Sequence, residues 1–225
     1  MFKKVLVILL AISIVLSFCA CGDNENGSTL SSSNTSSAPE KDWITEFKGI
    51  YSTIAIGLGY FDSPSEISAY AAFGFASCFV DSKESTVNYE DMVFTHHYDK
   101  TAIDNVTNRY FGMTYDYSQA VGSYDTGLVD FEYDADNSEL IIIFHGAFGG
   151  ESPMVAYVGC EQTGNDYKLT YEKTREYWNG SASEYYKVTA YITFRVDGDS
   201  YTVVSHTEGN TVEITEDEYW DFGQN

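Results

Sequence analysis

Histidine is the side chain best suited to acid–base catalysis or metal binding near neutral pH, and the chain contains four of them. His96 and His97 are adjacent, so on a strand their rings point to opposite faces and cannot both bind one ion without distortion. No His-x-x-x-His or Cys-x-x-Cys spacing occurs in the sequence. The histidine spacing therefore indicates no metal site, and the sequence predicts no cofactor.

A second candidate for metal chemistry is the acidic run 134–138, which places oxygen-bearing side chains at alternate positions, as calcium loops do. The sixth residue of this run is Glu139, where a calcium loop needs glycine. The twelfth is His145, where a bidentate glutamate belongs. We therefore interpret residues 134–137 as a hairpin loop whose side chains bond their own backbone.

The run from His145 to Gly150 follows an apolar strand and resembles the His-Gly turn that supplies oxyanion donors in α/β-hydrolases. The resemblance implies a nucleophile elbow with the pattern Gly-x-Ser-x-Gly, and no such pentapeptide occurs. The chain after Gly150 also reads as successive strands without crossover helices. A glycine-rich turn between strands is the better interpretation, and we expect the protein not to be an enzyme.

Two cysteines lie beyond the N-terminal region. Cys160 alternates with apolar residues, and Cys78 lies among phenylalanines, so each is predicted to be a small buried apolar residue. In an exported protein the pair could be oxidised, and a disulfide between Cys78 and Cys160 is an open alternative.

Tyrosine is unusually frequent, with 19 in the chain, and some tyrosines lie outside the predicted core faces. The stretch 113–127 has no clear periodicity and is longer than most connections in a compact domain, which is typical of functional loops. Exposed tyrosine rings can stack on sugars or pack on proteins, and carboxylates can accept hydrogen bonds. The candidate binding residues are Tyr115, Asp116, Tyr117, Tyr124 and Asp125.

These side chains must be positioned by a sheet, because the clearest periodic signal is a strand. Residues 185–196 alternate strictly between polar and apolar, which predicts one face on a core and one in water. Similar strands are predicted on either side, within 154–206, and the turns between them contain Gly164, Gly180 and Gly198. A hairpin, 128–133 with 140–144, precedes this meander, and the apolar 140–144 is predicted to be a central strand.

Helices are predicted in the N-terminal half. Asp42 is a candidate N-cap for a helix over 43–58, and Ser63-Pro64-Ser65-Glu66 is typical of the start of a second helix that runs to Val80. Residues 92–98 could form a strand or the end of a helix, and 103–111 before Gly112 predicts a short helix.

This order of elements resembles the cystatin-like and nuclear-transport-factor-like folds. The resemblance implies an α+β domain in which N-terminal helices pack on a curved antiparallel β-sheet meander and leave a cone-shaped pocket. Such folds host enzymes, ligand carriers and assembly domains, so the resemblance does not decide function.

The N-terminus predicts export. Lys3 and Lys4 precede an apolar run that is too short to span a bilayer comfortably, so residues 1–20 are predicted to be a signal peptide. The residues Phe18-Cys19-Ala20-Cys21-Gly22 resemble the lipobox of bacterial lipoproteins, which implies lipidation of a cysteine and attachment to the membrane. Cys21 fits better than Cys19 because Ala20 is small, although Phe18 stands where the family usually has leucine. An ordinary cleaved signal peptide is the alternative.

Residues 21–40 comprise the lipidated Cys21 and a Ser- and Asn-rich linker with too few large apolar residues to fold. Residues 41–225 are of a size that one core can serve, so a single domain is predicted. Loss of Lys3 and Lys4 would leave 10 basic and 34 acidic residues, a formal charge of −24. That charge disfavours binding to nucleic acid.

The sequence therefore predicts a protein held outside the cytoplasm, on the bacterial membrane, by its lipid at Cys21. Its folded part is expected to be a non-catalytic module that binds an envelope or extracellular partner, either a protein or a glycan. The alternative is a small-ligand carrier or an enzyme that uses the pocket of a cone-shaped sheet.

Overall fold

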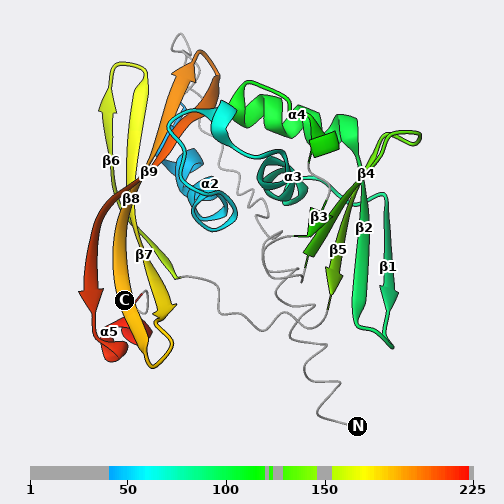
Figure 1. Cartoon of the computed structure of the whole chain (residues 1–225). Helices are drawn as coiled ribbons and strands as arrows, with labels where there is room; N and C mark the ends of the chain where they lie inside the picture. Colours follow the sequence, from blue (N-terminus) through cyan, green and yellow to red (C-terminus); the bar gives the residue numbers. More distant parts are fainter. Residues whose placement is uncertain (1–40, 120–121, 124–128, 146–153, 223–225) are drawn as a thin grey trace, which may run out of the picture. The chain divides into compact units, whose positions relative to one another are not determined.

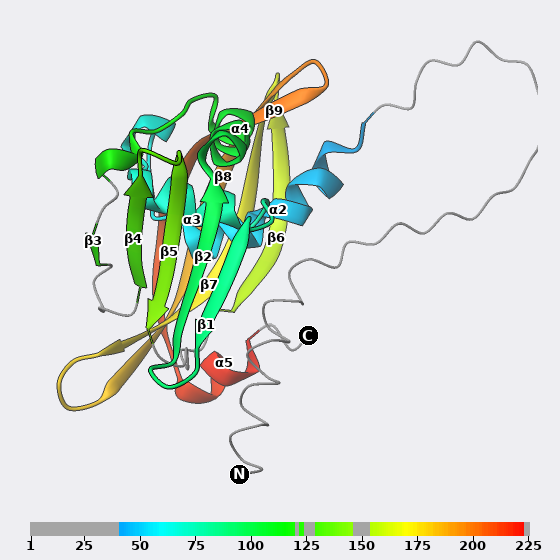
Figure 2. The same ribbon diagram turned by 90° about the vertical axis from the view of Figure 1, so that its right-hand side faces the viewer.

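The computed structural model describes residues 41–119, 122–123, 129–145 and 154–222. In this part of the chain the strands form two antiparallel sheets (Figure 1). The strands of the first sheet, in spatial order, are β1 (Glu84–Asn88), β2 (Val93–Asp99), β5 (Glu139–His145), β4 (Val129–Asp134) and β3 (Gly122–Ser123). Figure 2 shows this sheet face-on. The second contains β6 (Val155–Thr163), β7 (Asp166–Trp178), β8 (Ser183–Asp197) and β9 (Ser200–Ile214), paired in chain order.

The second sheet is the meander that the alternation predicts. On β8, the apolar positions Val188, Ala190, Ile192 and Phe194 are all 0 % exposed, which confirms the predicted core face. The glycines of its three hairpin turns, Gly164, Gly180 and Gly198, all have positive φ. Only glycine adopts this backbone conformation without steric cost, which explains its place in each turn. The last strand, β9, is longer than the short closing strand that the sequence predicts.

The expectation of one continuous sheet is wrong. The predicted hairpin β4–β5 forms, but β5 pairs with β2 on its other side. Because β5 has a hydrogen-bonded neighbour along both edges, no edge of it is available to β6. The meander therefore builds a sheet of its own, and β5 is a central strand of the first sheet, as predicted.

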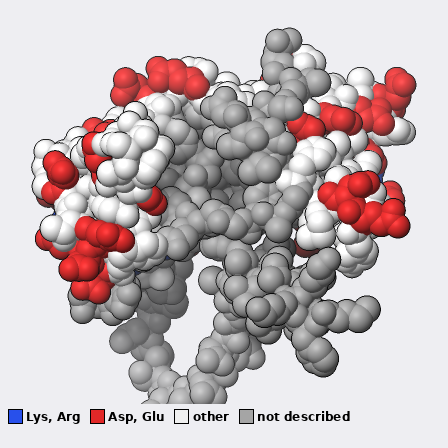
Figure 3. Space-filling view, turned by 60° about the horizontal axis from the view of Figure 1, so that its bottom comes forward, with Lys and Arg blue, Asp and Glu red and all other residues white. Residues whose placement is uncertain are grey.

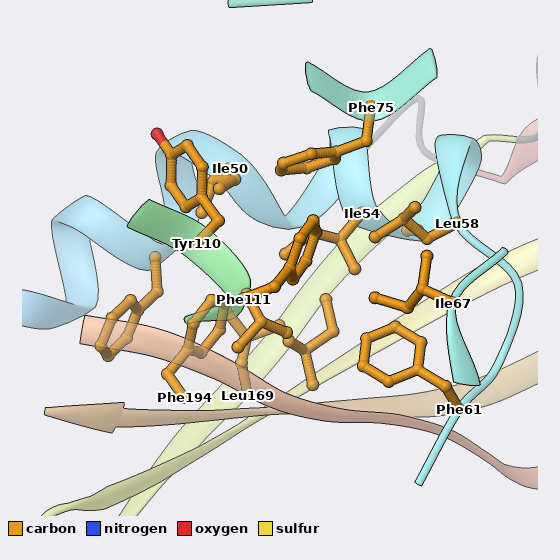
Figure 4. Close-up of a cluster of buried hydrophobic side chains, with 14 of the residues drawn as sticks. Ile50, Ile54, Leu58, Phe61, Ile67, Phe75, Tyr110, Phe111, Leu169 and Phe194 are labelled. Carbon is orange, nitrogen blue, oxygen red and sulfur yellow. The ribbon is translucent and has the colours of Figure 1, made fainter. Parts of the chain in front are cut away.

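Helix α2 (Trp43–Gly57) begins where the sequence predicts. The Asp42 side chain caps it by accepting a hydrogen bond from the Thr45 amide at 3.2 Å. Its apolar stripe buries Phe47, Ile50 and Ile54. The stripe lies against the inner face of the four-stranded sheet, in a cluster of buried side chains that includes Leu169 (Figure 4).

The predicted second helix, from Ser63 to Val80, is divided in two. A short 3-10 helix, η1 (Pro64–Glu66), is followed by its C-cap, Ile67, and α3 (Ala69–Ser77) then starts with its own N-cap, Ser68. Ile67 is extended, with ψ of 126°, and is 8 % exposed. Burial of the Ile67 side chain in an extended conformation accounts for the break, because a continuous helix needs a negative ψ at that position.

Helix α4 (Lys100–Phe111) confirms the prediction of a helix before Gly112, which is left-handed with φ of 69°. The ambiguous stretch 92–98 is a strand, β2. A C-terminal helix, α5 (Glu216–Asp221), was not predicted. Its signal is the pair Thr215 and Glu218, which form a capping box.

Helices α2, α3 and α4 lie between the two sheets (Figure 1), and the buried apolar side chains form two clusters. Helix α3 contributes to both. Ala72 and Phe75 belong to the cluster against the four-stranded sheet, while Phe73 and Ala76 belong to the cluster against the five-stranded sheet. This position explains why the segment is apolar nearly all round.

Candidate functional site

Two of the three tyrosines predicted to bind a partner pack against the rest of the protein. Tyr117 is 1 % exposed and its ring makes an edge contact with Phe73, at 6.3 Å between centroids. Tyr115 is half-buried and its hydroxyl donates to the Pro64 carbonyl oxygen at 2.8 Å. The expectation of exposed rings therefore does not hold for these two residues. Asp116 is exposed and accepts hydrogen bonds from Ser118, whereas Tyr124 and Asp125 lie outside the described residues.

The Tyr115 hydrogen bond gives a first prediction. Tyr115→Phe removes the donor to Pro64 and keeps the ring, so we expect a loss of about 1 kcal/mol in the free energy of unfolding. Urea denaturation followed by circular dichroism measures this loss. Tyr89→Phe is the matched control because Tyr89 is 68 % exposed. Equal stability of the two variants would contradict the assignment.

The two cysteines are free thiols in the structure, with no bond between them. Cys160 is half-buried and packs against the core, and burial raises its pKa. Cys78 is exposed at the C-cap of α3, so the prediction that it is buried is wrong. Phe75 and Phe73, three and five residues earlier, point into the two core clusters. Cys78 points in a direction between them, toward solvent.

Three of the histidines lie on the five-stranded sheet and each has one polar partner. His97 Nδ1 lies 3.1 Å from a Glu139 carboxylate oxygen, and His145 Nε2 lies 2.7 Å from Asp130. His96 Nδ1 lies 2.8 Å from the Ser85 hydroxyl. Among the described residues no three His, Cys, Asp or Glu side chains gather as a metal site would require.

The fourth histidine, His206, is the centre of a polar group that the sequence analysis missed. It lies on the inner face of β9, is 0 % exposed, and has a partner on both ring nitrogens. Nδ1 lies 2.9 Å from the Gly59 carbonyl oxygen, which can only accept, so Nδ1 carries the proton. Nε2 then accepts a hydrogen bond from the Tyr171 hydroxyl at 2.6 Å. Burial lowers the pKa of His206 to about 4, so the ring is neutral at pH 7.

Around His206 lie five further polar side chains, and we call the whole set the His206 cluster. Its members are Tyr60, Tyr171, Lys173, Arg175, His206 and Glu208. Tyr171, Lys173 and Arg175 are at alternate positions of β7, so their side chains share the inner face of the sheet. Glu208 of β9 joins them because it pairs with Ala190 of β8, which in turn pairs with Tyr171. A sequence signal existed, because Tyr167, Leu169 and Tyr171 define a core face that continues into two basic residues.

Burial disfavours the charged forms of two ionisable groups in this cluster. Burial lowers the pKa of Lys173 and raises that of Tyr60 to about 12. The Tyr60 hydroxyl is buried and has no hydrogen bond of acceptable geometry to any described group. It lies close to Glu208 and Arg175, whose charges act on its pKa. Arg175 Nη2 lies 3.3 Å from a Glu208 oxygen.

A second candidate site is an exposed group of large apolar side chains at the far end of the four-stranded sheet. Trp178 is 61 % exposed, Tyr177 59 %, Val212 46 % and Trp220 42 %. Figure 1 shows α5 beside this end of β7 and β8, where the rings of Tyr185 and Tyr219 lie 4.9 Å apart. We call this surface the aromatic end; it comprises the exposed Tyr177, Trp178, Val212 and Trp220 together with the half-buried Tyr185 and the buried Tyr219.

The aromatic end lies among acidic side chains. The described residues near it form a surface hollow lined by Lys187, Ile214, Glu218, Asp221 and Phe222. Glu176 accepts a hydrogen bond from the Ser183 hydroxyl, and Glu216 from the Trp220 indole at 3.5 Å. Acidic side chains also form separate patches over the face shown in Figure 3. A partner at this surface therefore meets exposed rings, carboxylates and hydroxyls.

Comparison with protein-family models, curated proteins and solved structures finds no match to this chain.

Proposed function

We propose that the protein is a lipid-anchored, extracytoplasmic binding module, and that its aromatic end binds a neutral glycan of the cell envelope. The observation that carries the proposal is the exposure of Tyr177 and Trp178 at adjacent positions of one strand. Adjacent residues of a strand point to opposite faces, so the tip of the β7–β8 hairpin offers a ring on each side.

The chemistry of the surroundings favours a sugar. Aromatic faces pack well on the apolar faces of sugar rings, and carboxylates such as Glu176 and Glu184 can accept hydrogen bonds from sugar hydroxyls. The abundance of acidic groups disfavours an anionic partner. A protein partner is the competing possibility for the same surface.

Binding to insoluble chitin, an uncharged polymer of N-acetylglucosamine, tests the proposal. We expect the purified protein to sediment with it, and Trp178→Ala to weaken this binding by about tenfold or more, as truncation of an aromatic anchor does. Tyr89→Ala is the matched control, because it removes an equally exposed ring from the turn between β1 and β2. Undiminished binding by the Trp178 variant, or no binding by the unmodified protein, would rule out this role.

The proposed anchor is a lipid on Cys21. The lipobox-like residues 18–22 support it. Separately, none of the described helices has the length and apolarity needed to cross a membrane. In a bacterial host, Cys21→Ala is expected to abolish labelling with a radioactive or clickable fatty acid, while Cys19→Ala keeps it. Labelling that persists in the Cys21 variant would contradict the assignment.

The alternative is a small-ligand carrier or an enzyme with the cone-shaped pocket of cystatin-like or nuclear-transport-factor-like folds. The His206 cluster is the observation that favours it, since buried ionisable groups often mark sites. His206 itself, however, has both nitrogens occupied by structural hydrogen bonds. The inner face of the same sheet is also covered by the apolar core, to which α2 contributes Ile54 and the C-cap residue Leu58 (Figure 4). We therefore favour the binding module.

A further inference from the structure

The two basic residues of the His206 cluster lie side by side on the inner face of β7. Lys173 and Arg175 are two positions apart, so their side chains project from the same face of the strand. They stand out in a chain that has 34 acidic and only 12 basic residues. Cations on the inner face of a sheet need partners, since a desolvated charge is costly without them.

Lys173 has fewer partners than its charge requires. Its Nζ lies 3.4 Å from the Ala55 carbonyl oxygen, close to the C-terminus of α2, and 4.8 Å from the centroid of the Tyr60 ring. No carboxylate of the described residues lies within salt-bridge distance of it. An ammonium group has three N–H donors, so a single hydrogen bond to a carbonyl oxygen leaves two of them without an acceptor among the described residues.

Two further donors lie close by. The Tyr60 hydroxyl is buried and lies close to the Glu208 carboxylate, but it makes no hydrogen bond of acceptable geometry with any described residue. Arg175 is paired with Glu208 through one nitrogen only, at 3.3 Å, and its side chain is 46 % exposed. A guanidinium has five N–H donors, so most of those on Arg175 are available. The cluster thus runs from a half-buried Lys173 to a solvent-exposed Arg175.

We propose that Lys173, Tyr60 and Arg175 form a binding site for the carboxylate group of a small organic acid. The carboxylate oxygens would accept hydrogen bonds from the lysine ammonium and the tyrosine hydroxyl, with the arginine at the exposed side. These are the charge-assisted contacts that a carboxylate makes most strongly. The inference is independent of glycan binding at the aromatic end.

The charge balance selects a carboxylate over a phosphate. Lys173 and Arg175 contribute two positive charges and Glu208 contributes one negative charge, which leaves one positive charge unbalanced. A monovalent carboxylate neutralises it. A phosphate with a charge near −2 would leave an excess negative charge beside Glu208, and like charges in contact are unfavourable.

Titration of the protein with sodium acetate, followed by two-dimensional ¹H–¹⁵N NMR at constant ionic strength, tests the site. We expect saturable shifts of backbone amides near Tyr60, Lys173 and Arg175. Lys173→Met keeps the length of the stem and removes the charge, and it is expected to raise the dissociation constant for acetate at least tenfold. Tyr60→Phe removes the hydroxyl alone and is expected to weaken binding by about threefold to tenfold, the range for one hydrogen bond.

Lys168→Met is the matched control. Lys168 lies on the same strand, with its Nζ 3.8 Å from the centroid of the Tyr191 ring, but on the opposite face. This variant should bind acetate as the unmodified protein does. A spectrum otherwise unchanged shows that each variant is folded, and if Lys173→Met fails this criterion, Tyr60→Phe decides the matter.

Three results would overturn the inference. These are the absence of saturable shifts up to tens of millimolar acetate, equal shifts in the Lys173 and Lys168 variants, and a saturable response to inorganic phosphate without one to acetate. Sedimentation with chitin is measured separately with the same variants. Failure of the carboxylate site therefore leaves the glycan proposal to its own experiment.

Discussion

Phe47→Ala is expected to lower the free energy of unfolding by about 3–5 kcal/mol, the usual cost of removing a fully buried phenylalanine ring. Phe47 is 0 % exposed and its ring stacks on Phe194 with centroids 4.1 Å apart and an angle of 4° between the planes. The rings of Tyr201 and Tyr167 meet its edge at 5.1 Å and 5.3 Å. Loss of the ring would thus open a cavity and remove its contacts with Phe194, Tyr201 and Tyr167 at once.

The effect is large because of where Phe47 lies. It joins α2 to three positions of the four-stranded sheet, on β7, β8 and β9. A domain of this size is usually stable by only about 5–15 kcal/mol, so the variant loses a large share of that margin. At about 2–4 °C per kcal/mol, the melting temperature should fall by about 10 °C.

Urea denaturation followed by circular dichroism measures the change. Ile44→Ala, one turn earlier on the same helix, is the control because Ile44 is 38 % exposed and is expected to cost much less. Similar losses in the two variants would mean that α2 does not pack on the sheet through the face that contains Phe47.

Much of the secondary structure could be predicted because it depends on local rules. The alternation over 185–196 fixes the inner face of β8, Asp42 caps α2, and Gly112 ends α4 in a left-handed conformation. Each of these features is decided within a few residues of the chain, by side-chain periodicity or by a capping hydrogen bond.

The division into two sheets could not be predicted in the same way. It depends on which strand occupies each edge of β5, and the partner β2 comes from a stretch that could equally have been helical. The break between η1 and α3 likewise depends on the core, because Ile67 is buried in an extended conformation. The helix start predicted at Ser63 is present, but α3 begins again at its own N-cap, Ser68, and only tertiary packing separates the two helices.

The candidate sites show the same limit. Tyr117 lies in a stretch without periodicity, which suggested a loop with exposed rings, yet contacts with α3 bury it. The His206 cluster depends on pairing between distant strands and on Gly59, so no motif marks it. The lipid proposed at Cys21 is predicted from the lipobox-like motif alone, which lies outside the described residues.

The pH dependence of stability follows from His206. Its pKa is about 4 in the folded protein and 6.5 in an ordinary environment, which is the value expected for the unfolded chain. Between these values the unfolded chain binds more protons than the folded protein. Stability therefore rises with pH across this window, and it is lost as the pH falls from about 6.5 to 4.

The groups that face His206 explain the size of this effect. The proton would have to enter at Nε2, which accepts from Tyr171, and the Tyr60 ring lies 4.8 Å away between centroids. The positive charge of Lys173 repels a protonated His206 ring and so lowers its pKa further. Nδ1 already donates its proton to the Gly59 carbonyl oxygen. A difference of about 2.5 pH units corresponds to about 3 kcal/mol, lost at up to about 1.4 kcal/mol per pH unit.

The expected result is a free energy of unfolding that is flat above about pH 7 and declines steadily toward pH 4.5, measured by urea denaturation at each pH. Carboxylates whose pKa is lowered, such as Glu139 and Asp166, lose their contribution mainly below that range. His96, whose pKa burial also lowers, acts in the same direction within the window, so His96→Gln is examined separately.

The double variant His206→Phe, Tyr171→Phe isolates the contribution of His206. It removes the titrating ring together with the Tyr171 hydroxyl that bonds to Nε2. Of the groups in these two hydrogen bonds, only the Gly59 carbonyl oxygen then remains, and it has lost its donor. We expect the variant to be less stable at pH 7 but to have a much flatter profile between pH 7 and 4.5. A profile as steep as that of the unmodified protein would show that another group controls the acid sensitivity, and that His206 takes up its proton in the folded state without cost.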